Sequence, residues 1–287
     1  MALDLDRRQR AMLEEMGIRV WLPEETAPAS VAPAAGPGPA SSESRAPAEA
    51  RMAPPPPRPA PPPASPELMA RASEVGSMDW AALQAAVAGC RACGLCKGRR
   101  NTVFGVGPER ADWMIVGEAP GEQEDLTGEP FVGPSGQLLD NMLRALRLHR
   151  LGRSATAAGS VANVYIANVV KCRPPANRNP EPQEVVSCAP FLRRQIELLQ
   201  PRIIIGMGRF ATQSLLQGVV QQVEAQPLGK LRGKVYRYQT GSASVPVVVT
   251  YHPAYLLRSL PAKAQAWEDL CLALEVVRQQ EQPGAAL

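Results

Sequence analysis

Residues 112–117 read "DWMIVG", a short apolar run that opens into a loop rich in glycine, proline and acidic residues, "GEAPGEQEDLTGEPFVGPSG" at 117–136. Three later runs share its character: "VYIANVV" at 164–170, "RIIIGMG" at 202–208 and "VPVVVTYH" at 245–252. Short, nearly continuous apolar runs are typical of strands that are covered on both faces. These four stretches therefore predict four strands at the centre of a layered domain.

Helical patterns lie between and after these runs, at 136–148, 182–200, 209–217 and 263–281. Strands that alternate with helices predict an α/β domain, a three-layer αβα sandwich around a mainly parallel central sheet. A further edge strand is a candidate at 233–238, "GKVYRY". In such sheets ligands bind outside the carboxyl ends of the strands, so the segments that follow the four runs should converge on one site.

The N-terminal part of the chain has a different composition. Residues 1–22 carry an amphipathic pattern, and residues 23–76 are rich in proline and alanine, with "PPPPRPAPPPASP" at 54–66. Proline at this density prevents helix and sheet, so the second segment predicts a disordered, extended linker. The folded domain is then expected at 77–287, with Ser77 as the N-cap of its first helix. The arm at 1–22 is either a tail without a function or a tethered partner-binding peptide.

Charge and composition exclude several classes of protein. The 31 Lys and Arg residues against 27 Asp and Glu give a net charge of +4, too mild to indicate nucleic-acid binding by itself. The first residues carry charges throughout and lack an apolar signal region, and no run approaches the roughly 18–20 apolar residues of a membrane span. We therefore expect a soluble, cytoplasmic protein. Its six cysteines are then metal ligands or buried thiols rather than disulfides.

Four cysteines form two spaced pairs. Cys90 and Cys93 have the spacing of a metal-binding turn, and Cys172 and Cys188 are separated by 15 residues. Four thiolates suit a tetrahedral zinc ion or an iron–sulfur cluster, and the spacing does not choose between them. Cys96 repeats the spacing after Cys93 and could compete with it as a ligand. The alternative is a set of unrelated buried thiols.

Three segments in order, "GEAPGEQEDLTGEPFVGPSGQLLD", "IANVVKCRPPANRNP" and "HPAYLLRS", resemble the signature segments of the iron–sulfur uracil-DNA glycosylases, often called family 4. The cysteine pattern is similar too, and the resemblance covers roughly residues 85–280. It implies an αβα sandwich and a [4Fe–4S] cluster on Cys90, Cys93, Cys172 and Cys188, with zinc less favoured. It also implies hydrolysis of the N-glycosidic bond of deoxyuridine in single- or double-stranded DNA, which leaves an abasic site for base excision repair.

The resemblance assigns roles within a pocket for a flipped base. Phe131 corresponds to the family phenylalanine that stacks on uracil, and its turn-rich neighbours disfavour a core position. Asn168 corresponds to the asparagine that reads uracil, since a side-chain amide both donates and accepts. His252 corresponds to the histidine that stabilises the departing uracil anion. Gly117 and Ala119 match substrate-binding positions of the acidic loop.

The resemblance leaves the general base open. Glu118 matches the motif glutamate and is expected to position the attacking water or the sugar. The aspartate that the best-studied glycosylase family carries one residue further on is replaced here by Ala119. Asn177 and Glu124 also match functional positions. Gly121 stands where other families place a tyrosine that excludes thymine, so discrimination must come from elsewhere, with Glu124 as the candidate.

The third segment is expected to contact DNA. Leu256 or Leu257 would fill the gap left by the flipped base, and Arg258 would contact a phosphate. Arg178 joins this predicted DNA surface with other cationic residues of the strand-end loops, namely Lys171, Arg173, Arg209 and Lys230.

The arm has a resemblance of its own. Its stretch "RRQRAMLEEMGIRVWLP" is similar to the start of the psi subunit of the bacterial replicative clamp loader, a segment that binds the chi subunit. This implies that residues 1–24 dock a monomeric enzyme to the replication machinery, and that it is nucleoid-associated when acting, with the linker giving reach.

Other functions are less well supported by the residues. A non-catalytic DNA-binding module could retain the pocket and the cluster, but the joint presence of Phe131, Asn168 and His252 argues against it. A relative that crosslinks to uracil-DNA would carry a basic, histidine-containing insertion that this chain lacks. A zinc-dependent base deaminase would need His-x-Glu and Pro-Cys-x-x-Cys, which are absent.

Overall fold

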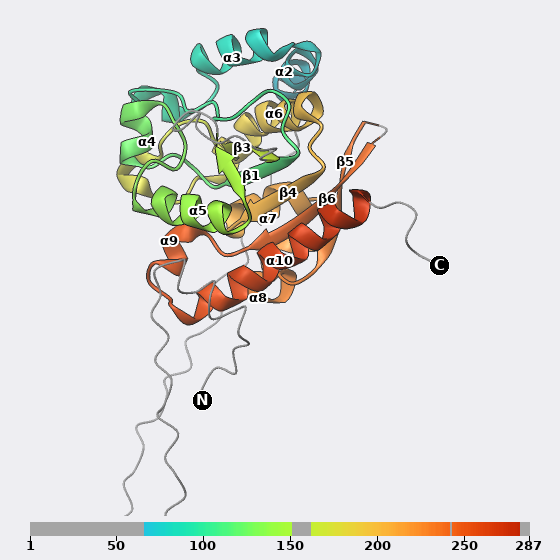
Figure 1. Ribbon diagram of the computed structural model, residues 1–287. Helices are drawn as coiled ribbons and strands as arrows, with labels where there is room; N and C mark the ends of the chain where they lie inside the picture. The colour runs from blue at the N-terminus through green and yellow to red at the C-terminus, as the bar shows by residue number, and fades with distance from the viewer. Residues whose placement is uncertain (1–65, 151–161, 242, 282–287) are drawn as a thin grey trace, which may run out of the picture.

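The structure is a computed structural model that describes residues 66–150, 162–241 and 243–281 (Figure 1). The predicted arm at 1–22 and most of the predicted linker lie outside the described residues. Within the described part of the chain, no helix is both long and apolar enough to cross a membrane.

Six strands form one sheet in the order β2-β3-β1-β4-β6-β5. All neighbouring pairs are parallel except β5 and β6, which are antiparallel. This confirms the mainly parallel sheet and the edge strand near 233–238. The strands are β1 (Trp113–Gly117), β2 (Leu148–Arg150), β3 (Ala162–Asn168), β4 (Ile203–Met207), β5 (Val235–Thr240) and β6 (Ala243–Thr250).

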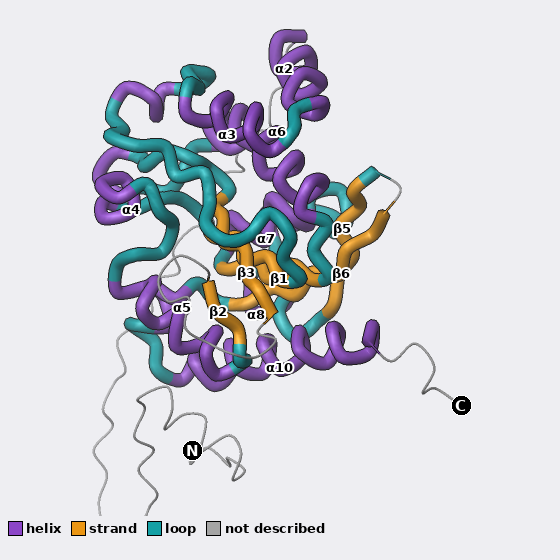
Figure 2. Tube along the Cα trace, turned by 45° about the horizontal axis from the view of Figure 1, so that its top comes forward, coloured by secondary structure: helices purple, strands orange, loops and turns teal. Residues whose placement is uncertain are grey.

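Helices cover both faces of the sheet, and the predicted three-layer sandwich is confirmed (Figure 2). Side chains of alternating strand positions pack against α6 and α7 on one face and against α5 and α10 on the other. The α-helices are α2 (Pro66–Ser77), α3 (Trp80–Ala88), α4 (Glu122–Thr127), α5 (Pro134–Ala145), α6 (Pro182–Leu199), α7 (Arg209–Leu216), α8 (Leu228–Leu231), α9 (Pro253–Leu256) and α10 (Pro261–Glu281). Short 3-10 turns lie at Gly94–Lys97, Pro175–Asn177 and Val223–Ala225.

The register brings the carboxyl ends of the strands together. Gly117 at the end of β1 pairs with Asn168 at the end of β3. On the other side, Met207 of β4 pairs with Thr250 of β6, two residues before His252. The segments that follow the strands therefore meet at one edge of the sheet, as the parallel arrangement predicts.

The start of the folded region differs from the prediction. Helix α2 occupies Pro66–Ser77, inside the range assigned to the linker, and Ser77 is its last residue. The N-cap of α3 is Asp79, whose carboxylate accepts a hydrogen bond from the Ala82 amide at 2.8 Å. The proline-rich composition ends at Pro66, which suits a first helical turn, so the boundary predicted at residue 77 is too late.

A second difference concerns the end of the helix predicted at 136–148. Helix α5 ends at Ala145, and His149 lies in the short strand β2, paired with Asn163 of β3. Its side chain is exposed, while Leu148 and Arg150 on either side are buried. This alternation is the period of a strand with one covered face.

Candidate active site

A pocket of about 430 Å³ lies at the carboxyl edge of the sheet, a volume within the usual range for small ligands. It brings together nine of the predicted site residues: Glu118, Ala119, Glu124, Phe131, Asn168, Asn177, Arg178, His252 and Arg258. Gly117 and Leu257 are not among its lining residues. Sequence reasoning missed Pro120, Ser135, Pro174, Asn179 and Ala254, which lie next to predicted residues in the same loops or, for Ser135, at the start of α5.

Gly117 stands behind the pocket and allows two of its side chains to approach. A Cβ atom at this position would overlap Asn168 Oδ1 and would lie 2.6 Å from Phe131 Cζ. Contacts this short do not occur between real side chains, so only glycine fits here. The position predicted to bind substrate therefore lies behind Asn168 and Phe131 and allows their close approach.

Asn168 carries the clearest sign of a ligand. Its side chain is only 2% exposed, and Oδ1 has no hydrogen-bond partner among the described residues. Leaving a buried amide oxygen unsatisfied costs about 1–3 kcal/mol. The backbone carbonyl of the same residue accepts from Lys171 Nζ at 2.8 Å, which fixes the end of β3. The strand therefore presents a rigid, unsatisfied acceptor to the pocket.

Phe131 lines the pocket and also belongs to the core between the sheet and α5, being 5% exposed. The expectation that its turn-rich neighbours disfavour a core position was wrong, because a left-handed backbone (φ 55°) turns the ring inward. The ring stacks against His252, with centroids 5.4 Å apart and planes 28° apart. Phe131 and His252 thus place two aromatic rings together at the pocket, and such rings can stack on a planar heterocycle.

His252 is held in one orientation by the turn that it starts. Its Nδ1 atom accepts a hydrogen bond from the Ala254 amide at 3.2 Å. Burial lowers the pKa of the imidazole to about 4, so the ring is neutral near pH 7. A neutral imidazole whose Nδ1 accepts must carry its proton on Nε2. His252 can therefore donate one hydrogen bond without a prior proton uptake.

Glu118 follows Gly117 directly and is half-buried at the pocket. Burial raises the pKa of its carboxyl group to about 7. A group whose pKa is close to the working pH is well matched to proton transfer. The position one residue further on, Ala119, contributes no ionisable group.

Glu124 organises the acidic loop. One carboxylate oxygen accepts from the Gly121 amide at 3.0 Å, and the other accepts from the amides of Val132 and Gly133 at 2.9 and 3.2 Å. A Cβ atom at Gly121 would lie 2.7 Å from this carboxylate, and its next neighbour is 3.8 Å away. The carboxylate thus binds the two ends of the loop together while it faces the pocket.

The cationic residues that were predicted to contact DNA differ in their burial and in their bonding partners. Arg178 reaches the pocket but forms a bidentate ion pair with Glu184 at 2.7 and 2.9 Å. Lys171 is 1% exposed and donates to Gln195 Oε1 at 2.6 Å, so it is not available to phosphate. The expectation for Lys171 was wrong because an apolar strand end carries it into the core. Asn177 lies at the rim, in a left-handed backbone (φ 54°), and accepts from Arg173 at 2.8 Å.

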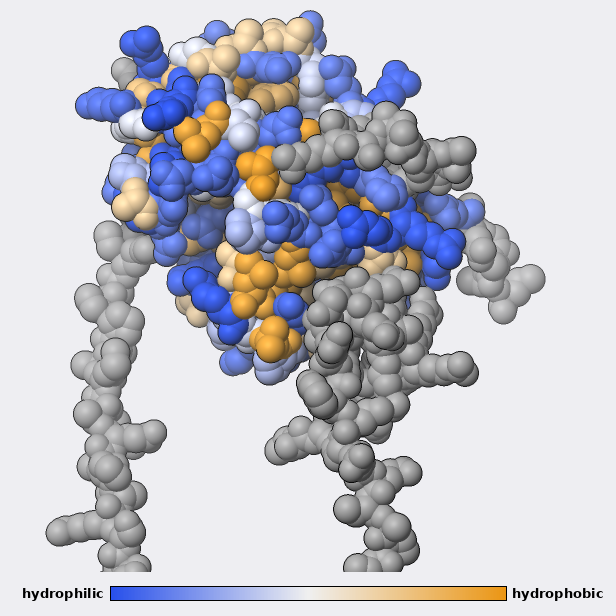
Figure 3. Space-filling model, turned by 60° about the vertical axis from the view of Figure 1, so that its left-hand side comes forward, coloured by the Kyte–Doolittle hydropathy of each residue, from blue (hydrophilic) through white to orange (hydrophobic). Residues whose placement is uncertain are grey.

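Two leucines of the third segment were predicted as candidates for the apolar wedge, and only one of them is exposed. Leu256 is fully buried, whereas Leu257 is 44% exposed. Figure 3 shows the side of the molecule that bears α4 as a mostly hydrophilic surface with separate hydrophobic patches. Leu257 and Leu260 are among the most exposed large apolar residues of the described chain, and both lie close in sequence to the pocket residue Arg258.

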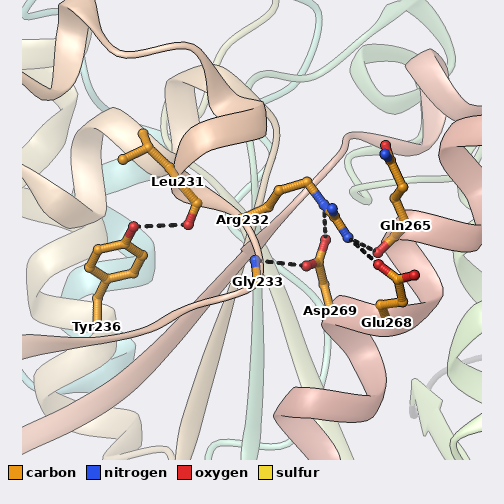
Figure 4. Close-up of polar contacts among 7 residues, drawn as sticks. All are labelled: Leu231, Arg232, Gly233, Tyr236, Gln265, Glu268 and Asp269. Atoms are coloured by element: carbon orange, nitrogen blue, oxygen red, sulfur yellow. Dashed lines mark hydrogen bonds and ion pairs between the residues drawn. The ribbon is translucent and has the colours of Figure 1, made fainter.

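A polar network joins the segment after α8 to helix α10 (Figure 4). Asp269 on α10 is fully buried and accepts from Arg232 Nε and from the Gly233 amide, each at 3.0 Å. The guanidinium group of Arg232 also lies over the ring of Tyr251, at 5.8 Å from its centroid. The same group contacts Glu268 and the Gln265 carbonyl. No motif in the sequence had indicated this network.

A second pocket is lined by the four cysteines of the predicted cluster site, Cys90, Cys93, Cys172 and Cys188, together with Cys96. Within the described chain, no three Cys, His, Asp or Glu side chains are arranged to hold one metal ion. Thiols placed around a shared pocket suit a multi-iron cluster, in which each thiolate binds a different iron. The cysteines therefore fit a [4Fe–4S] group. Cys271 lies on α10, against the opposite face of the sheet.

Comparison with known proteins identifies the family of this fold. Residues 104–271 match the Uracil DNA glycosylase superfamily, and the chain belongs to this superfamily.

Three type-4 uracil-DNA glycosylases illustrate the similarity. The protein from Archaeoglobus fulgidus is 44% identical over 168 residues, 58% of this chain and 78% of its own length. That from Pyrobaculum aerophilum is 40% identical over 195 residues, 68% of this chain and 93% of its own length. That from Thermotoga maritima is 40% identical over 173 residues, 59% of this chain and 79% of its own length.

Proposed function

We propose that this chain is a uracil-DNA glycosylase of the type-4 kind, which takes a flipped uracil into the pocket and hydrolyses its N-glycosidic bond. The observation that carries the proposal is the buried, unsatisfied Oδ1 of Asn168 beside the stacked rings of Phe131 and His252. The side-chain amide accepts through Oδ1 and donates through Nδ2, the pattern that matches N3–H and O4 of uracil. Uracil offers N3–H, whereas cytosine offers a bare N3.

In the proposed reaction, negative charge develops on uracil as its bond to the sugar breaks. The Nε2–H of His252 donates to uracil O2 and stabilises that charge, and a neutral donor suffices for this task. Phe131 holds the ring by stacking. Glu118 orients a water molecule toward the sugar carbon and receives or shares its proton as the carbon–oxygen bond forms. The products are free uracil and an abasic site.

The acidic loop excludes thymine in this proposal. Glu124 joins Gly121 to the segment around Val132 and so fixes the wall beside the base. A rigid wall discriminates against an added methyl group by about 1–3 kcal/mol. Glu124 is thus a positioning residue, which acts by holding the backbone of Gly121 and Val132 in place.

We further propose that Cys90, Cys93, Cys172 and Cys188 hold a [4Fe–4S] cluster whose task is to join the segment before α6 to the N-terminal helix α3. Cys172 follows Asn168 by four residues, so the cluster would fix the chain on which the base-reading amide stands. Zinc is the alternative, and iron and sulfide content of anaerobically purified protein distinguishes the two.

The DNA surface and the cellular setting complete the proposal. Leu257 fills the gap left by the flipped base, and Arg258 and Arg178 contact phosphates of single- or double-stranded DNA. The enzyme acts as a monomer in the cytoplasm and at the nucleoid. Residues 1–24 bind the clamp-loader chi subunit, and a pull-down that is unchanged when these residues are deleted would refute this partner.

The central test is excision of uracil. Anaerobically purified protein is incubated with a labelled uracil oligonucleotide and a chelator, and the product is treated with alkali. We expect cleavage at uracil, none at thymine, and loss of cleavage in Asn168→Ala. A folded, iron-containing protein that cuts nothing would overturn the proposal in favour of a binding module.

A further inference from the structure

Two arginine side chains donate hydrogen bonds to sulfur atoms of the cysteine pocket. Arg71 Nη2 lies 3.0 Å from Cys90 Sγ, and Arg99 Nη1 lies 3.0 Å from Cys172 Sγ. The contacts reach one cysteine from each of the two spaced pairs. Hydrogen bonds from cations to thiolates are among the stronger ones in proteins, because both partners are charged.

Arg71 belongs to a part of the chain that precedes the superfamily match. It stands on α2, whereas the match begins at residue 104. The guanidinium carbon of Arg71 lies 4.9 Å from the centroid of Phe191, which is three residues after Cys188 on α6. Val75, one turn further along α2, is 2% exposed in the same core. Helix α2 is therefore packed against the cysteine pocket by contacts that also fix Arg71.

The other Nη atom of each arginine, which does not contact sulfur, differs in its hydrogen bonding between Arg71 and Arg99. Arg99 Nη2 donates to the Ala88 carbonyl at 3.0 Å, which ties it to the end of α3. Arg71 Nη1 is buried and has no hydrogen-bond partner among the described residues. Since an unsatisfied buried donor is costly, the setting of Arg71 suits a further sulfur acceptor beside Cys90.

We infer that Arg71 and Arg99 form a cationic pair that tunes the cluster, and that α2 is an added wall of the cofactor site. The inference rests on the proposed [4Fe–4S] cluster. A cluster that gives up one electron becomes less negative, so nearby positive charge and N–H···S hydrogen bonds stabilise the reduced form more than the oxidised form. The two arginines thus raise the reduction potential and slow oxidative loss of iron.

The experiment uses full-length protein and four variants: Arg71→Gln, Arg71→Lys, Arg99→Gln and, as the matched control, Arg91→Gln. Arg91 is an exposed residue next to Cys90, and no contact of its side chain with sulfur is observed in the described chain. Iron and sulfide content and circular dichroism establish that each variant is folded and loaded. The readouts are the reduced-to-oxidised ratio at a fixed electrode potential and the decay of the visible cluster absorbance in air.

We expect Arg71→Gln and Arg99→Gln each to lower the reduced-to-oxidised ratio on the order of tenfold, equivalent to about 59 mV for a one-electron couple. Both variants should also lose the visible cluster absorbance faster in air than the parent. Arg71→Lys should give values between those of Arg71→Gln and the parent. The control Arg91→Gln should match the parent. Loaded Arg71→Gln and Arg99→Gln proteins that behave like Arg91→Gln would overturn the inference. A parent protein without iron and sulfide would instead refute the proposed cluster. If Arg71→Gln fails to fold, Arg71→Lys and Arg99→Gln decide the question.

Discussion

At the scale of single residues, the pocket combines groups that are costly to the fold with groups that suit a reaction. Asn168 leaves an acceptor unsatisfied, and Glu118 carries a carboxyl group whose pKa burial raises to about 7. Such groups are the usual mark of a functional site, since no packing advantage explains them. Two predictions separate their cost in stability from their value in catalysis.

Replacing Asn168 by alanine should abolish base reading without harming the fold. We expect kcat/KM for uracil excision to fall by roughly 10²-fold or more, because a pocket hydrogen bond to the substrate is lost. The free energy of unfolding should not fall, because removing an unsatisfied acceptor that costs about 1–3 kcal/mol offsets the loss of side-chain packing. Single-turnover kinetics and urea titration measure the two quantities. A large loss of stability would mean that the amide is structural.

The variant Glu118→Gln should be more stable than the parent at alkaline pH. The folded pKa of about 7 lies above the reference value of 4.5, so the folded state binds more protons between these values. Stability from this group is full below pH 4.5 and is lost as pH rises through 7. Because the group is half-exposed, we expect a gain of only about 1–2 kcal/mol at pH 8. Urea unfolding at pH 4 and pH 8 tests the difference, which should nearly vanish at pH 4, below the reference pKa of 4.5.

At the scale of elements, the apolar runs and their order were enough to predict the strands, because strands buried on both faces need such runs. The second signature segment, "IANVVKCRPPANRNP" at 166–180, shows where this reasoning ends. Its lysine follows the apolar run of β3 as a surface cation would, yet Lys171 is buried by bonds to Asn168 and Gln195. Gln195 lies on α6, 24 residues further along the chain, so no local sequence pattern reveals that Lys171 is buried.

Helix α2 was missed for a related reason. Its sequence follows a proline-rich stretch directly, and what stabilises it is packing against α6, including Arg71 over Phe191. Tertiary contacts usually decide whether a short helix forms. The three signature segments, by contrast, identified nine pocket residues, because each segment follows or adjoins a strand end whose position is fixed by the sheet.

The Arg232–Asp269 network should stabilise the contact between the segment after α8 and helix α10. Asp269→Ala would remove the buried partner of Arg232 and of the Gly233 amide, while Arg232 keeps Glu268, at a cost of roughly 2–3 kcal/mol. The matched control is Glu281→Gln, which breaks the exposed Arg202–Glu281 pair and should cost less than about 1 kcal/mol. Urea titration of the three proteins measures the difference. Equal effects for both variants would show that the network contributes no more than a surface pair.

At the scale of the whole molecule, the cysteine pocket joins parts of the chain that are far apart in sequence. It gathers residues from the end of α3, the loop after β3 and the first half of α6. The sequence predicted four of these cysteines by spacing and resemblance. It could not decide whether Cys96 takes part, because only the folded chain brings Cys96 to the same pocket.

Loss of the proposed cluster should therefore loosen the molecule as a whole. We expect Cys172→Ala to lose iron, to melt at a lower temperature and to bind uracil-DNA more weakly, because metal binding contributes to folding. Cys96→Ala and Cys271→Ala should keep their iron. Metal analysis and calorimetry test this set. Retained iron in Cys172→Ala together with loss in Cys96→Ala would reassign the ligands.

Gly117, the last residue of β1, and Gly121, the residue before α4, set different limits on redesign of this enzyme. At Gly117 every side chain collides with both Asn168 and Phe131, so selection for new base specificity should leave this position unchanged. At Gly121 an added side chain meets a single close neighbour, the carboxylate of Glu124. A library that varies residues 121 and 124 together and keeps Gly117 should therefore be the first to yield variants that accept new bases.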